Sequence, residues 1–245
     1  MTMKVCFTAA EMEPLAKVGG LADVAGALPA SLRAQDIDIR VVLPLHGSIR
    51  EQIDDFRKVT AFKITTRHGY EVVTVYDTQV EDLTVYLVDG KPIRNASSIY
   101  STDRIADGKK FAFFSKSILP LCERLSWSPH IIHANDWHTS NVVTEAYERN
   151  NIAQAGSHKR TILTIHNLPF MGAGIEDILD DYLIKEVDDP HLPLWGRKIP
   201  LPMGISRADR CVAVSPTYAD EIQTAEFGCG LEDYLFTHRR KLSGI

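Results

Sequence analysis

The chain has 245 residues, 44% of them hydrophobic and 24% charged, and a formal net charge of −5. This length suffices for one large α/β domain or two small ones. Because the 27 basic and 32 acidic residues are mixed along the chain, no basic stripe suits a nucleic-acid backbone and no polybasic segment suits a membrane surface, so neither partner is expected.

The N-terminal segment carries no signal for secretion or membrane insertion. It reads MTMKVCFTAAEMEP, a short apolar run followed by two glutamates, and no stretch of the chain reaches the ~20 apolar residues that span a bilayer. The four cysteines are scattered without a CxxC pair, which fits a reducing compartment. We therefore expect a cytoplasmic protein.

Short apolar runs bounded by polar or turn-forming residues predict buried parallel strands. These runs cover residues 5–9, 39–43, 131–134, 161–166 and 211–214. Between the runs, apolar residues spaced by three, four and seven predict amphipathic helices. The helical patterns cover residues 21–32, 111–125 and 142–147. The alternation predicts an α/β fold, a doubly wound and mostly parallel sheet of the Rossmann type.

One insert departs from this alternation. Residues 59–90 alternate apolar and polar side chains between short turns, which predicts an antiparallel meander at an edge of the sheet.

Prolines punctuate the C-terminal third of the chain. Residues 188–204 hold four of them, so we expect a surface loop there rather than a continuous helix. Farther on, Ser215 as N-cap and Pro216 at the first helical position predict the start of a helix.

The glycine pair in KVGGLADVAG lies where the first predicted strand gives way to a helix. Gly19 and Gly20 let the backbone approach a ligand, the helix start favours an anion, and Lys17 adds a positive charge, which together suit a phosphate. The alternative is a tight turn beside a solvated lysine. Neither GxGxxG nor GxxxxGK[ST] is present, which disfavours a nicotinamide-dependent oxidoreductase and a P-loop protein.

A second polar cluster, in IIHANDWHTS, follows another predicted strand. His133, Asp136 and His138 are possible metal ligands, but their spacing matches no standard zinc site. Asp136 with Trp137 equally suits a sugar, since a carboxylate bonds hydroxyls and an indole covers a ring face. In the structural alternative, Asp136 or Thr139 caps the next helix and Trp137 belongs to the core.

The third cluster lies in TILTIHNLPFMG, where His166 and Asn167 end a further predicted strand. A single histidine at a strand end is more often structural than catalytic. Three polar clusters at three strand ends of one parallel sheet, however, would gather along one rim, which favours a polar ligand site.

Four segments resemble, in order, the signatures of bacterial glycogen synthases and plant starch synthases, which are retaining glucosyltransferases of the GT-B architecture. They are EMEPLAKVGGLADVAGALP, HANDWHTS, TIHNLPFMG and SPTYADEIQTAEFGCGLEDYL. The resemblance implies that residues 1–240 form the N-terminal, acceptor-side Rossmann-like domain. Residues 241–245 would begin the connection to a second GT-B domain that this chain lacks.

The resemblance implies transfer of glucose from a nucleotide-sugar donor, usually ADP-glucose, to the non-reducing end of an α-glucan acceptor linked α-1,4. It implies no metal and no other cofactor. We expect front-side attack by the acceptor hydroxyl, because no carboxylate can be placed as a covalent nucleophile. With half of the active site on the second domain, the isolated chain is expected to be inactive or nearly so.

Site residues follow from the same motifs. The resemblance implies a catalytic contact between His166 and the transferred glucose, which would stabilise positive charge at the anomeric carbon. It implies donor-binding roles for Lys17, Gly19, Gly20 and Asp23. It implies contacts to the transferred or acceptor sugar for Asp136, Trp137, Asn167 and, in SSIYSTD, Tyr100.

The chain departs from the family pattern at several positions. Val18 replaces a threonine, Met171 stands for a glutamine, and Trp195 and Pro202 lie where the family commonly has an Asn-Gly pair and a lysine. The changes at Met171 and Trp195 favour a first alternative, a related GT-B transferase with another donor or acceptor. The lack of the second GT-B domain in this chain favours a second alternative, a non-catalytic glucan-binding module.

Overall fold

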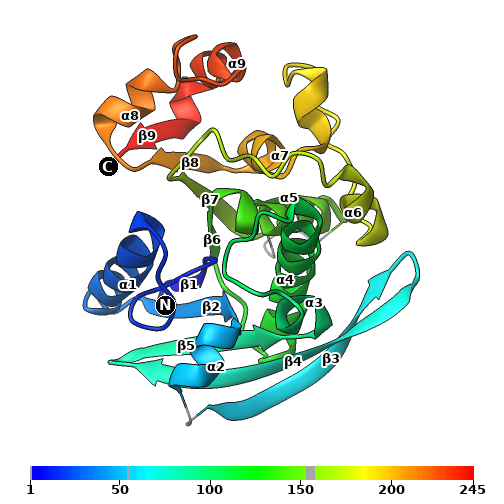
Figure 1. The fold of residues 1–245 in the computed structure, drawn as a ribbon. Helices are drawn as coiled ribbons and strands as arrows, with labels where there is room; N and C mark the ends of the chain where they lie inside the picture. The colour runs from blue at the N-terminus through cyan, green and yellow to red at the C-terminus, as the bar shows by residue number, and fades with distance from the viewer. Residues whose placement is uncertain (1, 54–55, 153–157) are drawn as a thin grey trace.

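The computed structural model describes residues 2–53, 56–152 and 158–245. Its strands form one nine-stranded sheet in the order β3-β4-β5-β2-β1-β6-β7-β8-β9 (Figure 1). The strands are β1 Lys4–Thr8, β2 Asp38–Pro44, β3 Arg57–Thr66, β4 Gly69–Val80, β5 Leu83–Asp89, β6 Ile131–Asn135, β7 Arg160–Ile165, β8 Arg210–Ala213 and β9 Leu242–Gly244. All five predicted strands are present, and the predicted mostly parallel α/β fold is confirmed.

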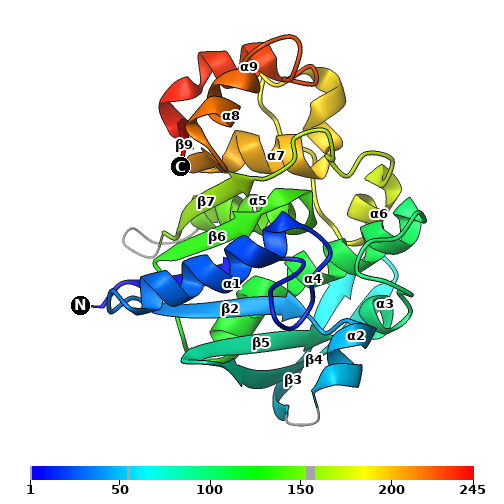
Figure 2. The same ribbon diagram turned by 60° about the vertical axis from the view of Figure 1, so that its left-hand side comes forward.

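Helices cover both faces of the sheet. The α-helices are α1 Gly20–Arg33, α2 Gly47–Gln52, α3 Lys91–Arg94, α4 Arg104–Arg124, α5 Asp136–Ile152, α6 Glu176–Asp181, α7 Pro200–Arg207, α8 Pro216–Glu221 and α9 Glu232–Thr237. Two 3₁₀ helices are η1 Leu194–Lys198 and η2 Arg239–Lys241. Helix α1 lies over one face of the sheet, and α4 lies behind the other (Figure 2).

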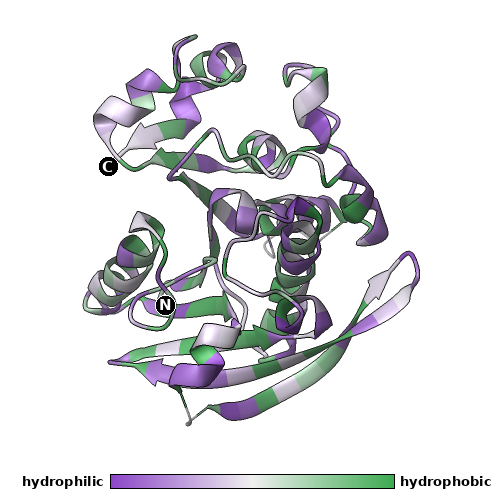
Figure 3. Ribbon diagram, viewed as in Figure 1, coloured by the Kyte–Doolittle hydropathy of each residue, from purple (hydrophilic) through white to green (hydrophobic). Residues whose placement is uncertain are grey.

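Alternate residues of the strands supply two cores, one on each face. Val5 and Phe7 of β1 pack in the core that includes Ala25 of α1, whereas Cys6 packs in the core that includes Phe113 of α4 and Val143 of α5. Because both faces are covered, the central strands read as continuous apolar runs and are largely hydrophobic in Figure 3.

The predicted antiparallel insert is also confirmed. Strand β4 pairs antiparallel with β3 and β5, and β5 joins the parallel part through β2, in register from Arg40 opposite Thr84. The insert therefore forms one edge of the sheet, with β3 outermost. Its apolar side chains, such as Phe62 and Val75, pack in the core on the α4 side.

The prediction of a loop throughout residues 188–204 is wrong, because helix α7 begins within it. Pro200 occupies the first position of α7 and Pro202 the third, where a backbone N–H has no intrahelical acceptor, so neither proline costs a hydrogen bond. The helix is buried from Pro200 to Ile205 and packs closely on α5, since a Cβ at Gly204 would lie 2.7 Å from the Ser140 Cβ.

The predicted start of α8 is confirmed. Ser215 is the N-cap, its hydroxyl accepts a 2.9 Å hydrogen bond from the Tyr218 amide, and Pro216 begins the helix. Within the described residues, no helix is long and apolar enough to cross a membrane.

Candidate active site

A cavity of about 630 Å³ lies beyond the carboxyl ends of β1, β6 and β7, and we call it the cleft. It is where a parallel α/β sheet places its ligand. Seven of the nine predicted site residues line it: Gly19, Gly20, Tyr100, Asp136, Trp137, His166 and Asn167. Lys17 and Asp23 are not among the lining residues. The structure thus brings together three loops that lie far apart in the sequence, while the roles of these residues remain predictions.

The glycine loop is held by a buried acid, Glu11, that the sequence analysis did not single out. Glu11 is 2% exposed, and one of its carboxylate oxygens accepts hydrogen bonds from the amides of Val18 and Gly19, the latter at 3.2 Å. These amides already have an acceptor within the protein. The first turn of α1, from Gly20 onward, is therefore the source of N–H groups for an anion.

Lys17 lies on this loop between two carboxylates. Its ammonium is 2.7 Å from Glu13 Oε2 and 2.6 Å from Asp23 Oδ1. The hydrogen bonds to Asp23 and Glu13 raise the pKa of Lys17 above its ordinary value, and the bond from Lys17 lowers the pKa of Asp23. Asp23 is thus a partner of Lys17, and these two bonds use two of the three N–H donors of the exposed ammonium.

Asp136 joins the loops that follow β6 and β7. It is the first residue of α5, with φ of 53°, and its Oδ1 accepts hydrogen bonds from the amides of His166 at 2.8 Å and Asn167 at 3.3 Å. The Asp136 carboxylate thus bonds amides after β7, and Thr139, the fourth residue of α5, bonds backward through its hydroxyl to the amide of Asn135 at 2.6 Å and to its carbonyl at 2.8 Å.

The Asp136 carboxylate lies in a poorly solvated place. Burial raises its pKa to about 7, the amides of His166 and Asn167 oppose that rise, and the negative charge of Glu11 adds to it. A carboxyl group that titrates near neutrality inside a ligand cleft is typical of a functional site.

The His166 ring is held in one orientation by Asn135. Its Nε2 lies 2.9 Å from Asn135 Oδ1, and the Asn135 amide group donates to the Thr8 carbonyl at 3.0 Å. Because that amide group is oriented by Thr8, its oxygen is the atom that faces His166, which assigns the imidazole proton to Nε2. Burial lowers the pKa of His166 to about 4, so the ring is neutral at neutral pH.

The two histidines of the second cluster, His133 and His138, have structural partners. His133 Nε2 lies 2.7 Å from the Thr164 hydroxyl, and the His138 ring packs against Tyr100, Phe111 and Trp137 with centroids 4.8, 4.6 and 4.5 Å away. Burial lowers the pKa of both rings. The part of the chain that the structure describes contains no group of three His, Cys, Asp or Glu side chains placed to hold a metal ion.

Tyr100 is positioned by one turn of α4, a second feature that the sequence analysis missed. The fully buried Lys110 donates to the carbonyls of the two residues before Tyr100 at 3.0 and 2.7 Å and to Asp107 Oδ1 at 2.7 Å. Asp107 Oδ2 accepts from the Ser101 amide at 2.8 Å. All three ammonium protons are thus used to fix the segment around Tyr100, whose phenol lies beside Glu11.

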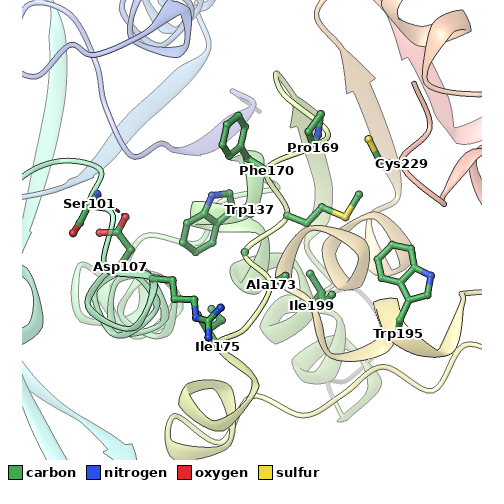
Figure 4. Close-up of a pocket in the computed structure, with 13 residues that line it drawn as sticks. Ser101, Asp107, Trp137, Pro169, Phe170, Ala173, Ile175, Trp195, Ile199 and Cys229 are labelled. Atoms are coloured by element: carbon green, nitrogen blue, oxygen red, sulfur yellow. Dashed lines mark hydrogen bonds between the residues drawn. The ribbon is translucent and has the colours of Figure 1, made fainter. Parts of the chain in front are cut away.

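A second cavity, of about 620 Å³, adjoins the cleft, and we call it the side cavity. In the view of Figure 4, Trp137 lies between Asp107 and Trp195, and Trp137 and Phe170 line the cleft as well. Two of the departures from the family pattern, Met171 and Trp195, line this cavity, whereas Pro202 is buried within α7. Val18, a further departure, is 64% exposed on the glycine loop.

Comparison with known proteins agrees with this architecture. Residues 4–237 match a family described as the starch synthase catalytic domain. The glycogen synthases of Bacillus cereus (strain Q1) and Lactococcus lactis subsp. lactis (strain IL1403) are 34% and 36% identical to the chain over 254 and 252 residues, which cover 99% of the chain and 52% of each relative.

A solved structure of the catalytic domain of starch synthase IV from Arabidopsis thaliana, bound to ADP and acarbose, is 27% identical and superposes with a TM-score of 0.86. The match covers 100% of this chain and 51% of that one, so the chain spans about half the length of the relatives it matches. The family match and the common fold support the same conclusion: the chain belongs to the starch synthase catalytic domain family.

Proposed function

We propose that the chain is the N-terminal catalytic half of a glycogen or starch synthase, which transfers glucose from ADP-glucose to the non-reducing end of an α-1,4-glucan with retention of configuration. The observation that carries this proposal is the cleft, where a helix start suited to an anion faces carboxylate, imidazole and indole side chains suited to a sugar. The relative from Arabidopsis, whose structure holds ADP and acarbose, supports the same pair of ligands.

In the proposed reaction, the bond between the anomeric carbon and the diphosphate oxygen breaks, and the acceptor hydroxyl forms the new bond on the same face of the sugar. The hydroxyl proton passes to the departing diphosphate. Lys17 and the first turn of α1 would stabilise the negative charge that develops on the diphosphate. Neutral His166, held by Asn135, would lie against the transferred glucose.

The carboxylates of the cleft support front-side attack over a covalent intermediate. Glu11 accepts two loop amides, Asp136 accepts two amides after β7, and Asp107 is bonded to Lys110 and to the Ser101 amide. Each therefore has a structural role in holding a loop in place, which is the observation that favours front-side attack. The remaining donor contacts would come from the second half, so we expect this chain alone to turn over very slowly.

A binding and turnover experiment tests the proposal. Titration of the chain with ADP, followed by calorimetry, should show binding that Lys17→Ala weakens about 10- to 100-fold, the range for a lost charge-assisted contact. Lys58→Ala is the matched control, because Lys58 is an exposed lysine on β3, outside the cleft. Equal loss in both variants would contradict the donor role of Lys17.

Glucose incorporation into glycogen tests the half-site claim separately. The chain should incorporate almost no glucose from ADP-glucose, and a rate comparable with that of two-domain relatives would contradict the claim. If glycogen co-sediments with the chain but ADP does not bind, the glucan-binding module replaces the enzyme as the better interpretation.

A further inference from the structure

The side cavity continues directly from the cleft. Four residues line both spaces, Ser101, Asp107, Trp137 and Phe170, so a ligand whose end lies in the cleft has an open path into about 620 Å³ of further space. An acceptor glucan is such a ligand, since only its terminal unit reacts and the rest of the chain must lead away.

Each tryptophan of the side cavity is backed by a glycine. At Gly172, with φ of 79°, a Cβ would lie 2.5 Å from Trp137 Cε3, and at Gly230, with φ of 83°, a Cβ would lie 3.2 Å from Trp195 Cζ2. Only glycine allows the backbone to lie so close to the indoles in these conformations. One side of each ring is thus supported by backbone, while both rings line the cavity.

Trp195 is available to a ligand. It is 45% exposed and lies across the side cavity from Trp137 (Figure 4). An indole that is already held in place loses little conformational entropy when a ligand stacks on it. Trp195 also occupies the segment where the chain departs from the family pattern, so its contribution belongs to this chain in particular.

The chemistry of the walls suits a glucose unit. The C–H faces of a pyranose are flat and apolar, and they match the two indoles together with Phe170 and Met171. The hydroxyl groups at the edge of the ring need hydrogen-bond partners, which Ser101 and Arg104 can provide.

We propose that Trp195 is a stacking platform for the glucose units of an α-1,4-glucan that follow the reacting terminal unit, and that it determines the preferred acceptor length. The inference rests on the proposed function and adds a specificity-determining residue to it. A linear oligosaccharide that reaches Trp195 gains a contact that a shorter one lacks.

The test compares maltose, maltotriose and maltotetraose as ligands of the 245-residue chain, by calorimetry and tryptophan fluorescence. Affinity should rise with length, and Trp195→Ala should lower the affinity for maltotetraose about three- to tenfold, as expected for one aromatic contact, while the affinity for maltose is unchanged. Trp195→Phe should keep most of the affinity. Leu194→Ala is the matched control, because Leu194 is 80% exposed, adjacent in η1 and not part of the cavity wall.

The outcomes separate this inference from the proposed function. If Trp195→Ala binds maltotetraose as tightly as the parent, or loses affinity equally for all three sugars, the platform is refuted while the glucan site remains. If none of the sugars and no ADP binds to the parent chain, both the platform and the proposed function fail.

Discussion

Asp136→Asn offers a test of how the cleft is built. Burial raises the pKa of Asp136 to about 7 from the ordinary value of 3.8. The difference is about 3 pH units, and at about 1.4 kcal/mol for each, ionised Asp136 lowers the free energy of unfolding by about 4 kcal/mol. Asparagine keeps an oxygen for the amides of His166 and Asn167 and tolerates the φ of 53° at this position.

The direction in which stability changes with pH follows from proton binding to Asp136. Between about pH 4 and pH 7 the folded chain holds a proton on Asp136 that the unfolded chain has released, so stability falls as pH rises through this window and is constant above it. The variant has no such dependence at this position. Asp136→Asn should therefore match the parent near pH 4 and exceed its stability by up to about 4 kcal/mol near pH 8.

Urea denaturation of both proteins across this pH range measures the effect. Buried histidines titrate in both proteins, so the difference between the two unfolding free energies isolates Asp136. Asp220→Asn, at an exposed position in α8, controls for the change of residue type and should show a flat difference. A parent that becomes the more stable protein as pH rises would refute the reasoning, because it would mean that folding favours the charged carboxylate.

Two further changes should destabilise the chain for different reasons. Gly172→Ala should lower the free energy of unfolding, measured in urea, by more than about 2 kcal/mol, because alanine is strained at φ of 79° and its Cβ would meet Trp137. Gly47→Ala is the control. It should change the free energy of unfolding little, since no atom lies within 4 Å of the new Cβ. Lys110→Met should lower the free energy of unfolding by about 3 kcal/mol and the melting temperature by roughly 6–12 °C, because Asp107 would stay buried without its cation. An unchanged melting temperature would contradict the stabilising role of the buried Lys110–Asp107 ion pair.

The fold was predictable where a single periodicity decides it. Strands buried on both faces read as apolar runs, so β1, β2, β6, β7 and β8 could be identified from the sequence alone. Helix α7 could not, because a proline breaks a helix or begins one depending on its position, and only the packing against α5 fixes where α7 starts. Strand β9 has only three residues, too few for a period to show.

The site was predictable where a polar motif follows a predicted strand, and not where a charged side chain is buried against loop backbone. Gly19, Asp136 and His166 follow predicted strands, and they meet at the cleft because parallel strands end at one rim. Lys110 gave no signal, since lysine is usually exposed and its acceptors lie in a loop that only the tertiary fold brings close. Glu11 was missed although its partners lie in the same motif, because glutamate is usually exposed and nothing in the motif shows that this side chain is buried.

The Glu11 carboxylate acts as a resident anion for the glycine loop. Because it bonds the amides of Val18 and Gly19, the loop has its shape before any substrate arrives, and binding need not order it. The N–H groups at the start of α1, from Gly20 onward, are those that Glu11 leaves open. The protein's own acid thus separates the amides that shape the loop from the helix start that lines the cleft.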